Sequence, residues 1–195
     1  MISLKNISFG YTSKLIIKDF SLDIQEKDLC LVSGKNGTGK STLLNIIVSL
    51  LKPQKGEVLT KSPIEYLAAE KNGLLLSQVL ASNLQFWRSL SGLSQDSELL
   101  DKIIAKWKLN TNVFTQNLSV MKFSTGMKRR LALARVEYST KPCWVLDEPT
   151  FGLDQDGVQT LQQTLQAHLS SGGCAVVVTH NPEWLSKLTT KTVSL

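Results

Sequence analysis

The stretch that most constrains this chain runs from Gly34 to Thr42 and reads Gly-Lys-Asn-Gly-Thr-Gly-Lys-Ser-Thr. It satisfies the phosphate-loop pattern G-x-x-x-x-G-K-[ST]. Glycines at these positions let successive backbone N–H groups curl around a phosphate, where side chains would obstruct it. Lys40 adds a positive charge for the β- and γ-phosphates, and the Ser41 hydroxyl is a ligand for Mg²⁺. The expected phosphate contacts are Gly34, Lys35, Asn36, Gly37, Thr38, Gly39, Lys40, Ser41 and Thr42.

The segments on either side of this loop support the same interpretation. Residues 29–32 form a short apolar run, which predicts a buried strand. Residues 42–51 predict a helix that stops at Lys52-Pro53. A strand, a loop and a helix in this order place a bound phosphate at a helix N-terminus, where the helix dipole favours negative charge. The alternative, a glycine-rich turn that binds nothing, does not account for these flanks.

The chain length and composition predict one nucleotide-binding domain over residues 1–195 with a small inserted subdomain. The first residues lack the organisation of a secretory signal, and no apolar run reaches the roughly 20 residues of a membrane span. We therefore expect a protein that is either soluble or held at a membrane through a partner. The net charge is +6, and the lysines are scattered rather than clustered. A surface that binds nucleic acid and a surface that lies near anionic lipid headgroups explain this charge equally well. Three separated cysteines in apolar stretches are expected to be buried, reduced thiols: Cys30, Cys143 and Cys174.

Hydrophobic patterning predicts an α/β fold. Residues 2–32 alternate apolar and polar positions, which indicates an antiparallel sheet laid against the nucleotide core. A further short strand is expected at residues 64–68. Residues 75–140 lose strand character, and residues 97–107 show helical periodicity, so this region is interpreted as an inserted helical subdomain. Tyr11 lies in a loop-like stretch and either stacks on an adenine ring or packs on the core as a strand-end aromatic.

A second informative stretch is the apolar run at residues 142–149, which ends in Asp147-Glu148-Pro149. A strand that ends in Asp places a carboxylate at the edge of a parallel sheet where ligands bind. Asp147 is therefore expected to hold Mg²⁺, and Glu148 to act as the general base that polarises the attacking water. A solvated turn is the alternative for this acidic pair.

The C-terminal part predicts a helix opened by Asp154-Gln155-Asp156 and then a buried strand that ends in His180. A single histidine is more often structural than functional. His180 follows a strand at the expected active edge, however, and this position favours a contact with the γ-phosphate.

These motifs, in this order, resemble the ATP-binding cassette family over essentially the whole chain. Residues 123–127, followed by a basic helix, are similar to the family's signature motif Leu-Ser-Gly-Gly-Gln. The resemblance implies an ATPase with an N-terminal antiparallel subdomain, working as a head-to-tail homodimer that sandwiches two ATP molecules. It also implies that Ser124 and Gly126 contact the γ-phosphate of ATP bound to the partner, that Asp154 lies in the loop crossing the dimer interface, and that His180 is the switch histidine.

The sequence departs from the family pattern at several positions. The signature has Phe123, Thr125 and Met127 where the family has leucine, glycine and glutamine. The glutamine expected before the helical insert corresponds to Glu70. Its carboxylate is still a ligand for Mg²⁺ or a water, but its charge near the phosphates weakens catalysis or alters coupling.

Within the family, finer features are similar to the ATP-binding subunit of the haem exporter of cytochrome c maturation. They include residues 66–67 and 83–87, the run Pro142-Cys143-Trp144 before the acidic pair, and the ending Thr179-His180-Asn181-Pro182. The chain ends soon after His180, and no appended regulatory domain is expected. The resemblance implies integral membrane permease partners, no nucleic acid, and a peripheral position on the cytoplasmic face of the bacterial inner membrane or the matrix face of the mitochondrial one.

Other functions stay open from the sequence alone. The same ATPase suits a transporter of another cargo, such as a metal, a lipid or a drug. A cassette protein acting on ribosomes or DNA is another class, but such proteins usually carry two cassettes or a long insertion. A nucleotide-binding regulator that does not hydrolyse ATP is a third; Glu148 argues against it, while Glu70 and the altered signature keep it open.

Overall fold

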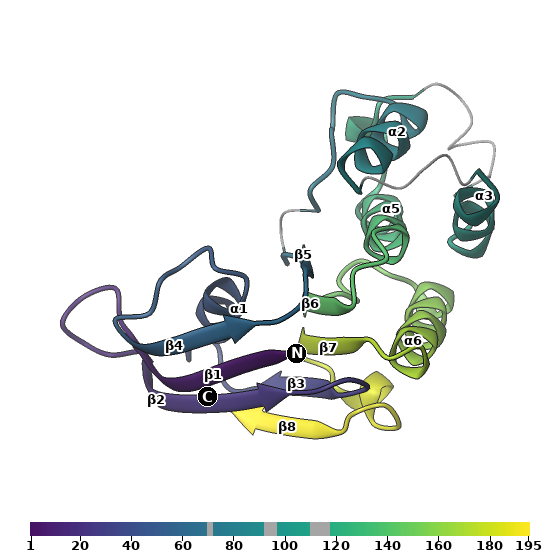
Figure 1. Cartoon of the computed structure of the whole chain (residues 1–195). Helices are drawn as coiled ribbons and strands as arrows, with labels where there is room; N and C mark the ends of the chain where they lie inside the picture. The colour runs from purple at the N-terminus through teal and green to yellow at the C-terminus, as the bar shows by residue number, and fades with distance from the viewer. Residues whose placement is uncertain (70–71, 92–96, 110–117) are drawn as a thin grey trace. The chain divides into compact units, whose positions relative to one another are not determined.

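The computed structural model describes residues 1–69, 72–91, 97–109 and 118–195. The chain forms two compact units, which are described separately. The first contains residues 1–66, 141–148 and 165–195, and the second contains residues 67–140 and 149–164. Figure 1 labels the helices and strands of both units. In the part of the chain described here, no helix is long and apolar enough to cross a membrane.

The first unit contains the predicted antiparallel sheet, in the order β2-β1-β4. Its strands are β1 (Ile2–Phe9), β2 (Ile17–Ile24) and β4 (Lys55–Thr60). Ile2 of the central strand pairs with Ile24 on one side and Thr60 on the other. Apolar residues such as Leu4 and Leu22 face the core while polar neighbours face solvent, so the alternation predicted a half-buried sheet correctly.

A five-stranded sheet in the order β5-β6-β7-β3-β8 completes the first unit. Strand β3 pairs in parallel with β7 and β8, and β6 pairs in parallel with β7. The central strands β3, β6 and β7 are buried almost throughout, as their uninterrupted apolar sequences require. The strands are β3 (Leu29–Ser33), β5 (Ile64–Leu67), β6 (Cys143–Asp147), β7 (Cys174–Val178) and β8 (Lys191–Ser194).

Helix α1 (Lys40–Ile47) is shorter than the sequence predicted. We expected it to continue to Leu51 and to stop at Pro53, but it ends at Ile47. Ser49 has a left-handed backbone conformation with φ 61°, and the amides of Leu50 and Leu51 both donate to the carbonyl of Asn45. A left-handed residue just after a helix satisfies its last carbonyls, so this turn ends the helix before the proline is reached.

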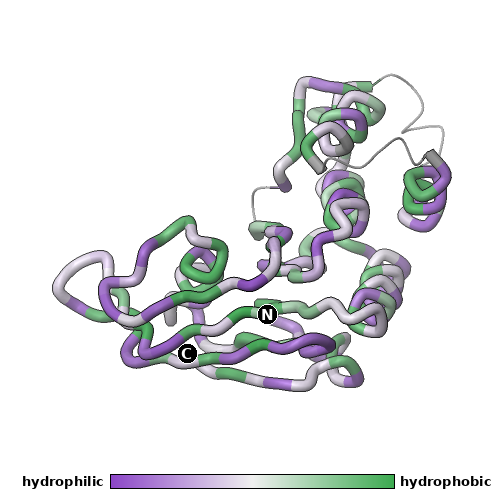
Figure 2. The backbone as a smooth tube through the Cα atoms, in the orientation of Figure 1, coloured by the Kyte–Doolittle hydropathy of each residue, from purple (hydrophilic) through white to green (hydrophobic). Residues whose placement is uncertain are grey.

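The second unit is helical, as predicted for residues 75–140. It contains α2 (Leu80–Ser91), α3 (Ser97–Lys106), the short 3₁₀ helix η1 (Val120–Lys122) and α5 (Thr125–Tyr138). Hydrophobic and hydrophilic residues alternate around α3 (Figure 2), in keeping with the predicted amphipathic helix. Helix α6 (Gln155–Ser170) begins in this unit and ends in the first.

Candidate functional site

The phosphate loop lies between β3 and α1, as the sequence predicted. Gly34, Gly37 and Gly39 all have positive φ, at 143°, 81° and 102°. A Cβ at Gly39 would lie 2.5 Å from Cγ2 of Ile16, so both the conformation and the space require glycine. A Cβ at Gly37 would meet nothing within 4 Å, so the loop is open on that side.

Lys40, the first residue of α1, folds back over this loop. Its ammonium donates to the carbonyl oxygens of Gly34 at 2.9 Å and Lys35 at 3.0 Å. The residue is only 8% exposed. The positive charge is therefore fixed beside the loop by the loop's own backbone, next to the N-terminus of α1, and both features favour an anion.

Ser41 and Asp147 are 106 residues apart in sequence but in contact in the structure. The Ser41 hydroxyl donates to Oδ2 of Asp147 at 2.9 Å. Asp147 is the last residue of β6 and is 4% exposed. A hydroxyl and a carboxylate beside a phosphate loop are the oxygen ligands that Mg²⁺ prefers, so these two residues fit the predicted metal.

The negative charge of Asp147 also acts on its surroundings. Burial, together with this charge, raises the pKa of Tyr66 to about 12. The Tyr66 hydroxyl therefore stays protonated. It donates a hydrogen bond to Oδ1 of Asn45, a residue of α1, at 3.2 Å. This bond links β5 to the helix that follows the phosphate loop.

Glu148 and His180 follow the neighbouring strands β6 and β7. Oε2 of Glu148 accepts from the His180 amide at 3.2 Å, and Nε2 of His180 lies 3.4 Å from Oε1. Glu148 has a left-handed backbone with φ 46°, while its own amide donates to the carbonyl of Val178. The structure thus brings together the base and the histidine that the sequence predicted separately.

Tyr11 lies beside the phosphate loop with its ring in solvent. The residue is 63% exposed, its ring meets Phe9 edge-on at 5.1 Å, and its hydroxyl lies 3.3 Å from Oγ1 of Thr42. Such a ring is not a core residue. It is available for stacking, which keeps the adenine interpretation as a prediction.

The signature residues belong to the second unit. Ser124 is the N-cap of α5, and its side chain accepts from the amide of Met127 at 3.2 Å. A Cβ at Gly126 would lie 2.6 Å from the carbonyl oxygen of Gly152, so glycine is needed for this close approach. The predicted helix N-terminus therefore exists, with a hydroxyl at its start.

Asp154 is bonded to Arg130, a residue for which the sequence predicted no role. The Asp154 carboxylate accepts from the Gly157 amide at 2.9 Å and from Arg130 at 2.6 Å. Both bonds lower the pKa of Asp154, and the bond from the Gly157 amide has the larger effect. Arg130 also donates to Asp156 at 3.1 Å. The basic run at residues 128–130 was the available signal, but only the fold shows which of its members meets Asp154.

Arg129 is buried beneath the segments that flank the predicted Glu70. The residue is 1% exposed and donates to the carbonyls of Ala68 and Pro149 and to Oδ1 of Asn72. Glu70 itself lies outside the described residues.

The structure thus groups the predicted site residues into two sets. The first unit contains the loop residues, Tyr11, Asp147, Glu148 and His180, and the second contains Ser124, Gly126 and Asp154.

Comparison with known proteins agrees with this geometry. The sequence profile of the ABC transporter family matches residues 17–151. The chain is 32% identical to the cytochrome c biogenesis ATP-binding export protein CcmA of Histophilus somni, over 92% of this chain and 86% of that protein. It is 35% identical to the CcmA protein of Roseobacter denitrificans, over 85% of this chain and 77% of that protein. The chain therefore belongs to the ABC transporter family, as one of its ATP-binding subunits.

Solved structures confirm the fold. An ATP-binding subunit of an ABC transporter superimposes with a TM-score of 0.91 at 22% identity, covering all of this chain and 85% of the other. A bacterial ABC transporter cassette, solved as a dimer, gives a TM-score of 0.83 at 24% identity, covering all of this chain and 94% of the other. The expected class, an α/β phosphate-loop fold with an antiparallel sheet and a helical insert, is thus confirmed.

Proposed function

We propose that this chain hydrolyses ATP to drive a membrane transporter that handles haem for c-type cytochrome biogenesis. The observation that carries the ATPase part is the contact of Ser41 with Asp147 at the phosphate loop, with Glu148 directly after it and held by His180. These are the parts that phosphoryl transfer to water requires: an anion-binding loop, oxygen ligands for Mg²⁺ and a carboxylate base.

In the proposed reaction, the loop amides and Lys40 bind the phosphates of ATP, and Tyr11 stacks on the adenine. Ser41 and Asp147 would hold Mg²⁺, which would supply charge neutralisation at the phosphate oxygens. Glu148 orients a water for in-line attack on the γ-phosphate and accepts its proton. The His180 amide and ring keep the Glu148 carboxylate in place and contact the γ-phosphate. Glu70 is retained in this proposal as a further ligand for the metal or a water.

The second half of each site is proposed to come from another copy of this chain. Ser124 and the N-terminus of α5, with Gly126, are suited to bind the γ-phosphate held by the partner's loop. The similar bacterial cassette is described as dimeric, and a second structure of it contains ADP and inorganic phosphate. ATP binding would then close a homodimer, and hydrolysis would reopen it.

The proposed cargo is supported by the relatives, whose names describe export in cytochrome c biogenesis. We infer that this subunit works on integral membrane permeases at the cytoplasmic face of a bacterial inner membrane, or at the matrix face of a mitochondrial one. The described residues provide no membrane-spanning helix, so the proposed membrane contact is made through these partners.

The ATPase proposal is tested by replacing the base. Glu148→Gln keeps the shape of the side chain but removes its proton acceptor, so we expect ATP binding to persist and turnover to fall by ~10²-fold or more. Steady-state phosphate release and nucleotide affinity measure the two effects. Glu57→Gln, an exposed change on β4, is the matched control and should hydrolyse ATP normally. Wild-type turnover in Glu148→Gln would remove Glu148 as the base.

The cargo proposal needs a separate experiment. The tagged protein is recovered from its native membranes in mild detergent, and its partners and any bound haem are identified. Haem-binding permease subunits are the expected result. A permease for a metal, a lipid or a drug would leave the ATPase standing and overturn the haem assignment.

A further inference from the structure

Three sulfur atoms meet at the beginning of β6 and β7, away from the residues proposed for ATP hydrolysis. The Sγ atoms of Cys143 and Cys174 lie 3.4 Å apart. The Sδ atom of Met1 lies 3.5 Å from the first and 3.9 Å from the second. Cys143 and Cys174 are register partners on adjacent parallel strands, and both are fully buried. Met1, Cys143 and Cys174 are called the sulfur cluster below.

The spacing of these atoms suits a metal ion with three sulfur ligands. The point equidistant from three atoms separated by 3.4, 3.5 and 3.9 Å lies about 2.1 Å from each of them, as the radius of the circle through all three. A metal–thiolate bond is about 2.3 Å long. Each sulfur would therefore need to move outward by only about 0.2 Å. A disulfide, by contrast, requires the two Sγ atoms to approach to about 2.05 Å and leaves Met1 without a role.

We propose that the sulfur cluster binds one Cu(I) ion through Met1 Sδ, Cys143 Sγ and Cys174 Sγ. Thiolate and thioether ligands are soft and select Cu(I) among the common first-row metal ions. Structural zinc almost always takes four ligands, and its ligands are Cys, His, Asp or Glu rather than Met. Within the described residues, no group of three or more His, Cys, Asp or Glu side chains is placed to hold a metal, so zinc has no complete site there.

The proton balance of binding follows from the two thiols. Cu(I) displaces one proton from each cysteine, and the resulting complex of Cu⁺, two thiolates and one thioether carries a single negative charge without any change of oxidation state. Cys174 donates a hydrogen bond to Cys143, so the two thiols that would ligate the ion are already in contact.

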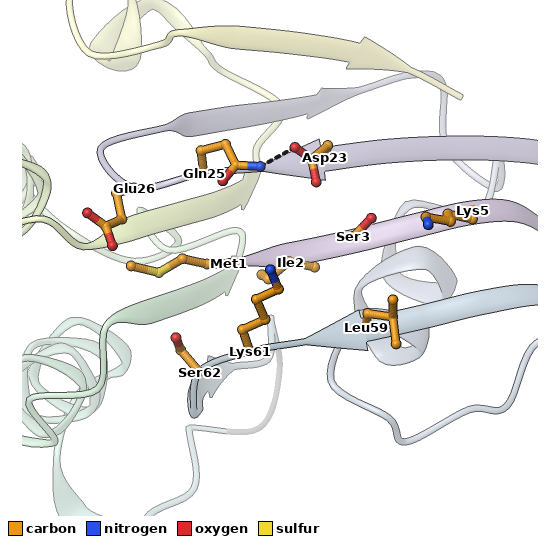
Figure 3. A pocket seen from close by; sticks show the side chains of 10 residues that line it. All are labelled: Met1, Ile2, Ser3, Lys5, Asp23, Gln25, Glu26, Leu59, Lys61 and Ser62. Carbon is orange, nitrogen blue, oxygen red and sulfur yellow. Dashed lines mark hydrogen bonds between the residues drawn. The ribbon is translucent and has the colours of Figure 1, made fainter.

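Met1 also provides a route from solvent to the two buried cysteines. It lines a pocket of about 620 Å³ beside the antiparallel sheet. Figure 3 shows Met1 among the side chains around this pocket, together with the carboxylates of Asp23 and Glu26 and the ammonium groups of Lys5 and Lys61. A thioether that faces both the pocket and the thiols is placed to transfer a soft ion inward.

The test titrates the reduced full-length chain with Cu(I) in the absence of oxygen, in competition with a chromophoric Cu(I) chelator. Intact mass first verifies that Met1 is retained. We expect one Cu(I) per chain and an X-ray absorption spectrum with three sulfur neighbours at about 2.3 Å. Cys143→Ala and Cys174→Ala should each weaken binding by more than ~100-fold, because even groups that only support a metal ligand contribute ~10–100-fold.

Cys30→Ala is the matched control, because Cys30 is a buried thiol in the neighbouring strand β3 but lies outside the sulfur cluster. This variant should bind Cu(I) as tightly as the wild type. Met1→Leu, prepared by removing a leader peptide, tests the third ligand and should show only two sulfur neighbours. Absence of binding, two sulfur neighbours in the wild type, or loss of binding in Cys30→Ala would overturn the proposal. The wild-type spectrum decides even if a cysteine variant fails to fold.

Discussion

Arg130 determines where the Asp154 carboxylate lies, and its effect is local. The guanidinium donates to Asp154, to Asp156 and to the carbonyl of Trp107. It is the more buried partner, at 11% exposure of the side chain against 68% for Asp154. In the proposed dimer Asp154 lies at the interface, so Arg130 would control the position of the interface loop.

The residue-scale prediction is that Arg130→Ala raises the pKa of Asp154 and Asp156 toward their ordinary values. Both carboxylates lose a charge-assisted bond, while Asp154 keeps the Gly157 amide and Asp156 keeps Lys108 at 2.8 Å. Carboxyl-carbon NMR titration measures the shift. Lys128→Ala is the control on the same helix, because Lys128 donates to the Met121 carbonyl and to neither acid in the described structure. Identical titration curves in wild type and Arg130→Ala would contradict the prediction.

At the residue scale, the sequence predicted best the polar side chains that come directly after a buried strand. Asp147, Glu148 and His180 were predicted as site residues because a polar residue after an apolar run stands at the sheet edge where ligands bind. Arg130 was not found, because its partners are 24 and 26 residues further on and the spacing carries no periodic signal. The Cys143–Cys174 contact was also missed, because it depends on which strands become neighbours.

Among the elements, the end of α6 is sensitive to pH through His168. The imidazole stacks on Trp144 of β6 with ring centroids 3.7 Å apart, and its Nε2 lies 3.2 Å from the carbonyl of Cys174. Burial lowers the pKa of His168. The folded chain therefore binds a proton here less readily than the unfolded chain does.

The element-scale prediction concerns stability below neutral pH. As the pH falls below about 6.5, His168 becomes protonated in the unfolded chain but, because its pKa is lowered, less so in the folded chain. The free energy of unfolding therefore decreases. His168→Phe keeps the stacking and removes the titration. Its lost bond to Cys174 lowers stability by a pH-independent amount. Urea denaturation at several pH values between 7.5 and 5 should show the wild type losing more stability than the variant. Parallel profiles would contradict the assignment.

Element boundaries were predicted less well than element types. The alternation in β1 and β2 and the apolar runs of β3, β6 and β7 predicted these strands correctly, because burial on one or both faces dictates the pattern. Strand β8 was not predicted. Its four residues alternate between half-buried and exposed and pair with β3 at the edge of the sheet, so little apolar sequence is required of them.

At the scale of the whole molecule, the proposed dimer predicts that two inactive chains rescue each other. Lys40→Ala removes the loop cation, and Ser124→Arg blocks the signature helix, so each variant alone should be inactive. In a mixed dimer one site receives the intact loop of the second variant and the intact signature of the first. An equal mixture should therefore recover up to roughly a quarter of wild-type turnover, since half of the dimers carry one good site of two.

The control for this experiment mixes Lys40→Ala with Glu148→Gln. Both changes lie in the same half of the proposed site, so no combination of these chains contains an intact site and no activity should return. No recovery in the first mixture would contradict the shared site, and recovery in this control would show that Lys40 and Glu148 do not act in the same half of the site. The sequence resemblance implied that each site is shared between two chains. Only the structure shows that, within one chain, the phosphate loop and the signature residues belong to different compact units.

The left-handed backbone of Glu148 has a consequence for how this protein can change. A side chain in that conformation costs about 1–2 kcal/mol, which glycine does not incur, while glycine loses about 0.5–1 kcal/mol of entropy on folding. Selection for stability alone therefore favours glycine at position 148, where ATP hydrolysis is proposed to need a carboxylate. Laboratory evolution for heat resistance alone should drift toward stable, inactive chains at this residue, and a screen for thermostable variants must read out hydrolysis as well.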